Sequence, residues 1–229
     1  MKTLLANGCS YTYGAGLDEN LREEKVWPNQ VKELLGYDRT VNLAVGCGSN
    51  QRIVRTIIQW ILSQPSSVLE NTLAIIQFTD LHRYEYYVPK QNEVWENDEE
   101  RWIRNKIDAA IVPGDFLDRQ EANDYNDIRL KTYTDIEGYW TWVSQCQTLS
   151  SLFDKFGIKY YFWQLSGHRI NPDKIYYEFL LENYNWINND INFPCEFERI
   201  SKYDCHANVK GHREIAEFLV NYIKTQNLY

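Results

Sequence analysis

Short apolar runs alternate along this chain with longer segments in which apolar residues recur at helical spacing. Uninterrupted apolar runs of this length predict strands that are covered on both faces. They lie at Lys2–Ala6, Thr40–Val45, Thr72–Phe78 and Lys159–Leu165. Helical spacing, together with capping residues such as Ser49 or Asn50 before the second segment, predicts the helices. These cover residues 26–36, about 50–62, 135–156 and 208–224.

Strands that alternate with helices predict a three-layer α/β/α fold around a mostly parallel central sheet. We expect a single domain over residues 1–229. The segment from about 81 to 132 differs, because it is rich in charge, Trp and Tyr and has weak periodicity, and we interpret it as a long insertion after the third strand. A further helix is expected over Tyr176–Trp186 and irregular structure over Asn188–Tyr203.

Charge and cysteine content narrow the range of partners and compartments. The 32 acidic residues outnumber the 24 basic ones, giving a net charge of -8, and a field of that sign disfavours nucleic acid and anionic membranes as partners. Five cysteines without a C-x-x-C pair do not form a disulfide framework. With neither a signal peptide nor a membrane span in the sequence, we expect a cytoplasmic protein. Release by lysis or mounting on a particle would leave no mark in the sequence.

A small-residue turn follows the first predicted strand directly. It reads Gly8-Cys9-Ser10-Tyr11-Thr12-Tyr13-Gly14. A serine on a tight turn at a strand end can present its hydroxyl and its backbone N–H together, as a nucleophile requires. A serine in such a place also commonly serves only as a turn or capping residue.

A second reactive segment precedes the last predicted helix. Asp204 and His206 lie close together in Asp204-Cys205-His206-Ala207-Asn208. A carboxylate can hold one ring nitrogen of an imidazole while the other takes a proton from a serine. The alternative is that Asp204 or Asn208 simply caps the helix.

Taken together, these segments resemble the conserved blocks of the SGNH (GDSL-like) hydrolase family. GCSYTYG is similar to the first block, G-D-S-x-x-x-G, and DCHANVKGH to the last, D-x-x-H-P-x-x-x-G-H. The segment NLAVGCG, residues 42–48, is similar to the second block. The resemblance implies Ser10 as nucleophile, His206 as base and Asp204 as its partner. It also implies an oxyanion hole formed by the N–H groups of Ser10 and of Gly48 or Gly46.

Three positions depart from that family pattern. Cys9 stands where the first block has Asp, and only one residue separates Asp204 from His206 instead of two. The third block, G-x-N-D, has no Asn here, since the strand is followed by Thr79 and Asp80. An ionised carboxylate would oppose a developing oxyanion, so Asp80 would have to be protonated or turned away, or Asn50 would have to supply the donor.

The remaining candidate residues are histidines, an arginine and a possible metal set. His212 matches the family's second, structural histidine. Thr79, His82, Arg83 and His168 lie at predicted strand ends, where they could contact substrate. Cys9, Cys47, Cys205 and His206 could meet in the fold, but they lack the short spacing typical of metal ligands, and we expect no metal. Without a phosphate-binding glycine loop, no cofactor is expected either.

The resemblance implies an ester hydrolase that works through an acyl-enzyme. The aromatic content of 15% and the acidic insertion favour a polar, acetylated carbohydrate over a long lipid, so an O-acetyl esterase acting on a small-molecule or glycan ester is expected. An O-acetyltransferase with the same triad is an alternative, and so is a non-catalytic carbohydrate-binding or structural module. The sequence does not determine the oligomeric state.

Overall fold

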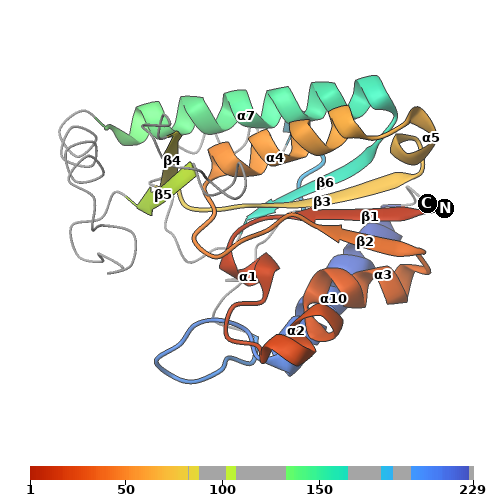
Figure 1. The fold of residues 1–229 in the computed structure, drawn as a ribbon, viewed down its shortest axis with the longest axis vertical. Helices are drawn as coiled ribbons and strands as arrows, with labels where there is room; N and C mark the ends of the chain where they lie inside the picture. The colour runs from red at the N-terminus through yellow and green to blue at the C-terminus, as the bar shows by residue number, and fades with distance from the viewer. Residues whose placement is uncertain (82, 88–101, 107–132, 165–181, 188–196, 227–229) are drawn as a thin grey trace, which may run out of the picture.

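A parallel four-stranded sheet forms the centre of the molecule, which was obtained as a computed structural model (Figure 1). The structure describes residues 1–81, 83–87, 102–106, 133–164, 182–187 and 197–226. The strand order is β2-β1-β3-β6, and every neighbouring pair is parallel. The strands are β1 (Thr3–Asn7), β2 (Arg39–Asn42), β3 (Thr72–Phe78) and β6 (Lys159–Gln164).

Helices cover both faces of this sheet, as the sequence predicted. One face carries α4 (Asn50–Ser63), α5 (Ser66–Leu69) and α7 (Asp135–Phe156). The other carries α2 (Glu19–Lys25), α3 (Trp27–Leu35) and α10 (Val209–Thr225), while the short α1 (Ser10–Tyr13) lies just beyond the end of β1. No helix in the described part of the chain is long and apolar enough to cross a membrane.

Alternation along the strands divides the buried side chains between two cores. In β3, Ala74 and Ile76 pack with α4 and α7, whereas Leu73 and Ile75 pack with α3 and α10. Successive side chains of a strand point to opposite faces, so a strand between two helical layers is apolar throughout. The seven residues of β3 are all buried, which explains why an unbroken apolar run marked it in the sequence.

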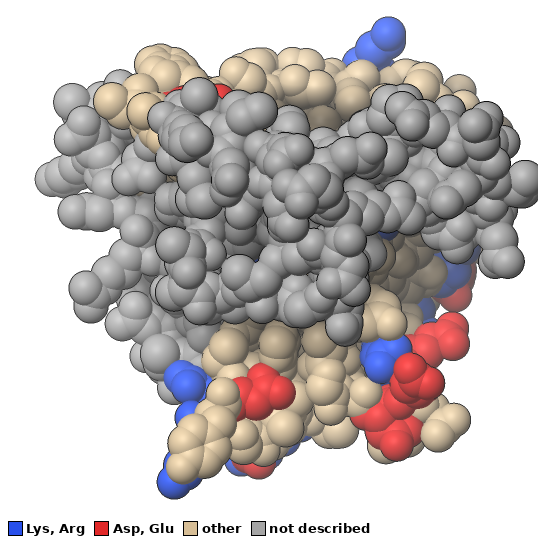
Figure 2. Space-filling model, turned by 60° about the vertical axis from the view of Figure 1, so that its left-hand side comes forward, with Lys and Arg blue, Asp and Glu red and all other residues tan. Residues whose placement is uncertain are grey.

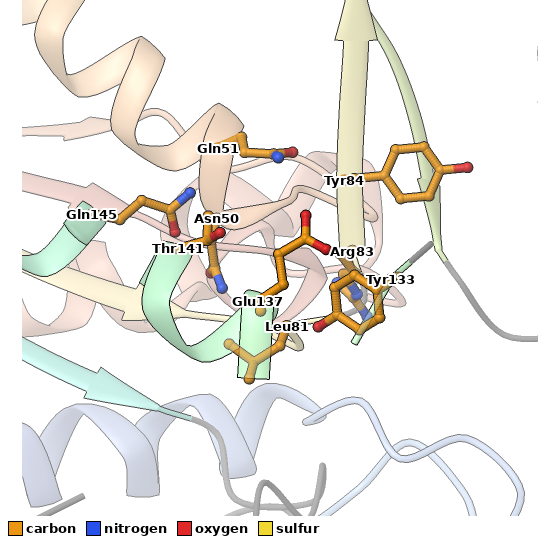
Figure 3. Close-up of a pocket in the computed structure, with 10 residues that line it drawn as sticks. Asn50, Gln51, Leu81, Arg83, Tyr84, Tyr133, Glu137, Thr141 and Gln145 are labelled. Carbon is orange, nitrogen blue, oxygen red and sulfur yellow. The ribbon is translucent and has the colours of Figure 1, made fainter. Parts of the chain in front are cut away.

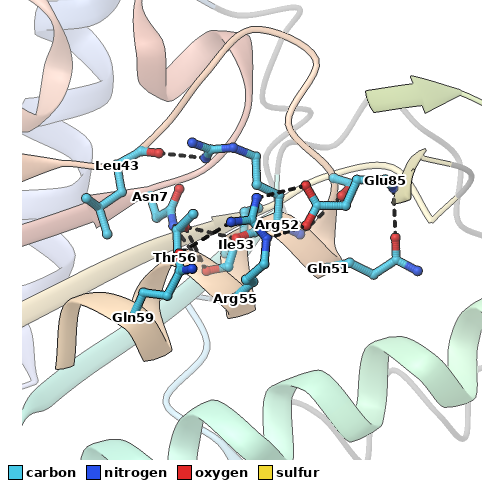
Figure 4. A network of polar contacts seen from close by, with 10 residues as sticks. Asn7, Leu43, Gln51, Arg52, Ile53, Arg55, Thr56, Gln59 and Glu85 are labelled. Atoms are coloured by element: carbon cyan, nitrogen blue, oxygen red, sulfur yellow. Dashed lines mark hydrogen bonds and ion pairs between the residues drawn. The ribbon is translucent and has the colours of Figure 1, made fainter. Parts of the chain in front are cut away.

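An antiparallel pair of strands lies apart from the main sheet. It consists of β4 (Arg83–Tyr87) and β5 (Trp102–Lys106), within the segment expected to be an insertion. The pair is attached to α4 by a buried ion pair, in which the Arg55 guanidinium donates to both carboxylate oxygens of Glu85 at 2.9 and 3.1 Å (Figure 4). The Glu85 backbone N–H donates to the Gln51 side chain at 3.0 Å. These contacts fix β4 against the first turns of α4.

Three local expectations from the sequence were wrong or incomplete. The helix expected to run to Trp186 does not, because Trp186 lies alongside β6 in a parallel bridge with Phe162; residues 176–181 lie outside the described residues. The second strand ends at Asn42 instead of Val45. Helix α2 was not expected, since it buries no side chain and has no apolar face to detect; its N-cap is Asp18.

Candidate active site

Ser10 begins helix α1, three residues beyond the end of β1. The Asn7 side chain fixes the backbone that leads to Ser10. Its amide donates to the Ile53 carbonyl and the Thr56 hydroxyl of α4, and its oxygen accepts the Gly8 N–H at 2.8 Å. A Cβ on residue 8 would lie 2.4 Å from Thr12 Oγ1 and 2.8 Å from Gln77 Oε1. Only glycine allows the chain to turn this closely against the sheet, and the turn places Ser10 at its edge.

The imidazole of His206 contacts the hydroxyl of Ser10, although the two residues are 196 positions apart in the sequence. Nε2 of His206 lies 2.9 Å from Oγ of Ser10. Nδ1 of the same ring lies 2.7 Å from Oδ1 of Asp204, which also accepts the His206 backbone N–H at 3.0 Å. That backbone N–H is the largest cause of the lowered pKa of the Asp204 carboxyl, so the carboxylate is charged at neutral pH. The arrangement therefore allows a proton to pass from Ser10 to His206.

A hairpin-like loop before α10 presents Asp204 and His206. The Ile200 N–H donates to the His206 carbonyl at 2.9 Å, and the Asn208 N–H donates to the Glu198 carbonyl at 3.1 Å. The N-cap of α10 is Asn208, whose side chain accepts the Gly211 N–H at 2.9 Å and donates to Glu198 and Arg199. Because Asn208 does the capping, the Asp204 carboxylate remains available to His206.

Aromatic and sulfur groups support the imidazole from the side of α1. The Tyr11 ring lies 4.8 Å from the His206 ring, centroid to centroid, and the Tyr11 hydroxyl donates to Sγ of Cys205 at 2.8 Å. Burial raises the pKa of the Tyr11 phenol, so it stays protonated and remains a donor. Cys9, at the position of the family's Asp, is buried and accepts from the Gln77 amide at 3.4 Å.

The backbone N–H groups expected to form an oxyanion hole differ in whether they already have a hydrogen-bond partner. The Ser10 N–H stands at the first position of α1, where an N–H has no partner within the helix. A Cβ on residue 48 would lie 2.9 Å from the Gly8 carbonyl oxygen, so the turn after β2 packs directly on the Ser10 turn. The Gly48 N–H donates to the Val45 carbonyl in a long 3.3 Å bond. Gly46, the alternative, lies in the same turn.

Asn50 connects the start of α4 to the end of β3. Its amide donates to the Thr79 carbonyl at 3.1 Å and accepts the Thr79 N–H at 2.8 Å. One amide hydrogen of Asn50 is not used in this pairing. Thr79 and Asp80 are both buried beside it. Of the residues expected to contact substrate, Arg83 lines a pocket next to Asn50, whereas His82 and His168 lie outside the described residues.

His212 lies behind the site and is 1% exposed. Its Nδ1 accepts the backbone N–H of Trp27 at 3.3 Å, which joins α10 to the start of α3. Burial, with a smaller contribution from nearby His206, lowers its pKa to about 4. A neutral, buried imidazole of this kind holds two helices together, which fits the structural place given to it by the family pattern.

Of the metal set considered from the sequence, Cys205 and His206 belong to a cluster of possible ligands. Among the described residues, Asp204, Cys205 and His206 bring one ligand atom each to within 4.8 Å of one another. These atoms already bond to one another or to Tyr11. An ion held there would therefore compete with the hydrogen bonds that orient His206. Cys9, Cys47, Cys146 and Cys205 carry free thiols.

A polar pocket lies next to these groups, between α4, β4 and the first turns of α7 (Figure 3). Sequence reasoning did not identify its α7 wall, which includes Glu137, Thr141 and Gln145. In the space-filling view, basic and acidic side chains lie next to one another in the lower part of the face shown (Figure 2).

Comparison with known proteins gives one family and a set of similar folds. The model of the "Family of unknown function (DUF6071)" matches residues 11–178, and no curated protein matches the chain. Among solved structures, a member of the lipolytic protein G-D-S-L family from Veillonella parvula DSM 2008 has 12% identity and a TM-score of 0.51. That match covers 96% of this chain and 97% of the other.

Two esterases share the fold at similar identity. A psychrotrophic esterase from Pseudoalteromonas sp., solved in a form inhibited by monoethylphosphonate, has 11% identity and a TM-score of 0.54, with 99% of this chain and 98% of the other covered. A carbohydrate esterase whose active site displays divergent catalytic and non-catalytic binding functions has 10% identity and a TM-score of 0.50, with 99% and 69% covered. At these identities the likeness establishes the fold, which is that of SGNH hydrolases.

Proposed function

The chain belongs to DUF6071, a family of unknown function, and we propose that it is a serine-dependent hydrolase of carboxylic esters. One observation carries the proposal: Ser10, His206 and Asp204 form a continuous hydrogen-bonded chain, with distances of 2.9 and 2.7 Å. A nucleophile, a base and a group that orients the base, connected in this order, are the parts that acyl transfer requires.

In the proposed reaction, Oγ of Ser10 attacks the ester carbonyl carbon while its proton moves to Nε2 of His206. The N–H of Ser10 faces the developing oxyanion, and the Gly48 N–H joins it when its long bond to Val45 opens. Collapse of the intermediate expels the alcohol, which takes the proton from His206. Water, activated by the same imidazole, then attacks the acyl group and releases Ser10 and a carboxylic acid. Asp204 stays ionised and stabilises the imidazolium.

The proposed substrate is an acylated, polar molecule, of which an O-acetylated carbohydrate is the leading example. The polar character of the pocket beside Asn50 supports this choice, since its lining offers amides, hydroxyls and charges and little apolar surface. A long acyl chain would need an apolar channel to bury it.

Hydrolysis of 4-nitrophenyl acetate and 4-nitrophenyl decanoate tests the proposal. The native chain is expected to hydrolyse the acetate faster than the decanoate, and Ser10→Ala to lose about 10³-fold or more in kcat. Ser151→Ala removes an exposed serine on α7 and serves as the matched control, with unchanged rates expected. A native rate equal to that of buffer, or full activity in Ser10→Ala, would contradict the proposal.

A non-catalytic carbohydrate-binding protein is the alternative, and one observation favours it. The family's third-block Asn is absent, and the Gly48 N–H is already bonded to Val45. Loss of one oxyanion donor typically costs about 10²–10³ in rate. Glycan binding without turnover, equal in the native chain and in Ser10→Ala, would support this alternative.

A further inference from the structure

The pocket between α4, β4 and α7 is lined almost entirely by polar side chains. Asn50, Arg83, Tyr133, Glu137, Thr141 and Gln145 surround it, with Leu81 as an apolar part of its wall. In Figure 3, Glu137 of α7 lies between Arg83 on one side and Asn50 and Thr141 on the other. The lining contains one cation, one anion and several neutral groups that both donate and accept hydrogen bonds.

Arg83, which lines this pocket, has a side-chain donor without a hydrogen-bond acceptor in the described part of the chain. Its Nη1 is buried and has no hydrogen-bond partner among the described residues. A buried guanidinium N–H without an acceptor is costly, and such groups are usually satisfied by a partner, a water or a ligand. An occupant that carries oxygen acceptors suits a pocket wall that includes the Arg83 guanidinium.

The wall formed by Tyr133 depends on a glycine in α7. A Cβ on residue 138 would lie 2.0 Å from the Tyr133 hydroxyl oxygen and 3.4 Å from Leu81 Cβ. Glycine inside a helix destabilises it by roughly 1 kcal/mol relative to alanine. Its presence in the first turn of α7 lets Tyr133 approach the helix and close one side of the pocket.

The pocket and Ser10 open at the same edge of the sheet. Asn50 lines the pocket and is bonded to Thr79, the residue that follows β3. β3 pairs with β1, with Asn7 opposite Ile76, and Ser10 follows β1. The carboxyl ends of adjacent parallel strands thus carry the nucleophile and the pocket wall as neighbours.

We propose that this pocket is the subsite for a neutral sugar residue of the ester's alcohol part. The inference rests on the proposed ester hydrolysis and adds the place where the sugar binds and the part of the substrate that it holds. Sugar hydroxyls both donate and accept, and so match a lining that contains Arg83, Glu137 and amides. Glu137 disfavours an anionic group at this place, and the scarcity of apolar lining disfavours a fatty chain.

A bulky side chain at position 141 tests the subsite. Thr141 and Thr148 are both exposed on α7, but only Thr141 lines the pocket, so Thr141→Trp fills it and Thr148→Trp is its matched control. Binding of deacetylated xylo-, manno- and chito-oligosaccharides is measured by isothermal titration calorimetry with Ser10→Ala as background. Rates are measured on the acetylated forms of the same oligosaccharides and on 4-nitrophenyl acetate.

We expect one of these oligosaccharides to bind, and Thr141→Trp to weaken its binding and its kcat/KM about tenfold or more, a larger loss than on 4-nitrophenyl acetate. Thr148→Trp should change none of these values. Equal losses in both Trp variants, no loss in Thr141→Trp, or no binding by any oligosaccharide would overturn the subsite. Binding lost in Thr141→Trp alone, in a chain that hydrolyses no ester, would keep the subsite and overturn the proposed hydrolysis. Ester hydrolysis by the native chain, together with oligosaccharide binding that Thr141→Trp leaves unaltered, would keep the proposed hydrolysis and overturn the subsite.

Discussion

Asp204 accepts two hydrogen bonds from His206 at a single carboxylate oxygen, one from the ring Nδ1 at 2.7 Å and one from the backbone N–H at 3.0 Å. With one residue between them, the backbone bond closes an Asx turn from Asp204 to His206. The backbone bond holds the carboxylate independently of the imidazole ring. With Nδ1 of the ring bonded to this carboxylate, Nε2 points to Ser10.

Replacement of Asp204 by asparagine should therefore impair catalysis more than folding. The amide would favour the wrong imidazole tautomer, and we expect kcat to fall by about 10³–10⁴-fold, as is typical of a triad aspartate. Since the Asp204 pKa lies below its ordinary value of 3.8, the native rate between pH 5 and 8 should not report titration of this carboxyl. Rates on 4-nitrophenyl acetate across that range provide the measurement.

Asp154→Asn is a suitable control for that variant, because Asp154 is an exposed acid at the end of α7. Its rates should equal those of the native chain. A loss of less than tenfold in Asp204→Asn would show that the carboxylate does not support His206 during the reaction.

His212 makes stability depend on pH. Its folded pKa of about 4 is lower than the ordinary 6.5, so below pH 6.5 the unfolded chain takes up a proton that the folded chain does not. Stability should therefore fall as pH drops from 6.5 towards 4, by at most about 1.4 kcal/mol per pH unit. His212→Asn keeps an acceptor for the Trp27 N–H and removes this dependence. Thermal unfolding of the native chain and of His212→Asn at pH 7 and pH 5 measures this dependence. An equal decrease of stability in the two proteins would contradict His212 as its source.

Gly211 allows the loop that carries Asp204 and His206 to approach α10. A Cβ on residue 211 would lie 2.2 Å from the Glu198 carbonyl oxygen, a backbone atom that cannot move without the loop. Gly211→Ala should reduce the free energy of unfolding by about 1–3 kcal/mol and lower ester hydrolysis, since overpacking displaces Asp204 and His206 together. Chemical denaturation and rates test this, with the exposed Val209→Ala as control. Native rates in Gly211→Ala would show that the loop does not need this contact.

The Arg55–Glu85 pair should stabilise the attachment of β4, whereas a surface pair should not matter. The Glu85 side chain is 2% exposed and that of Arg55 15%, so Arg55→Met leaves a carboxylate buried without its partner and should cost about 3 kcal/mol. Arg213 and Glu217 form a pair whose side chains are about half exposed, and Arg213→Met should cost less than about 0.5 kcal/mol. Equal losses of unfolding free energy in the two variants would contradict this account.

The sheet and its main helices could be predicted because burial leaves a mark in the sequence. The strand Thr72–Phe78 is covered on both faces and is therefore apolar throughout, and α4 and α10 each bury one regular face. Ser10, Asp204 and His206 were predicted for another reason, since the chemistry needs those residue types and the family pattern gives their order along the chain; the structure places the three side chains in hydrogen-bond contact.

The rest depended on contacts that the sequence does not encode locally. Asn208 and Asp204 are both good helix caps by type, and only the bonds of Asn208 to Gly211 and Glu198 decide between them. The α7 wall of the pocket could not be foreseen, because Thr141 and Gln145 look like ordinary polar positions on a helix. The parallel bridge of Trp186 likewise depends on β6 lying beside it.

The reactivity of Ser10 towards a fluorophosphonate tests the central claim most directly. Intact-mass spectrometry of the native chain, Ser10→Ala and His206→Ala after exposure reports covalent phosphonylation at any serine. An activated Ser10 predicts one adduct on the native chain, none on Ser10→Ala and strongly slowed labelling of His206→Ala. No adduct on the native chain between pH 6 and 9, or an adduct that persists in Ser10→Ala, would contradict Ser10 as the nucleophile.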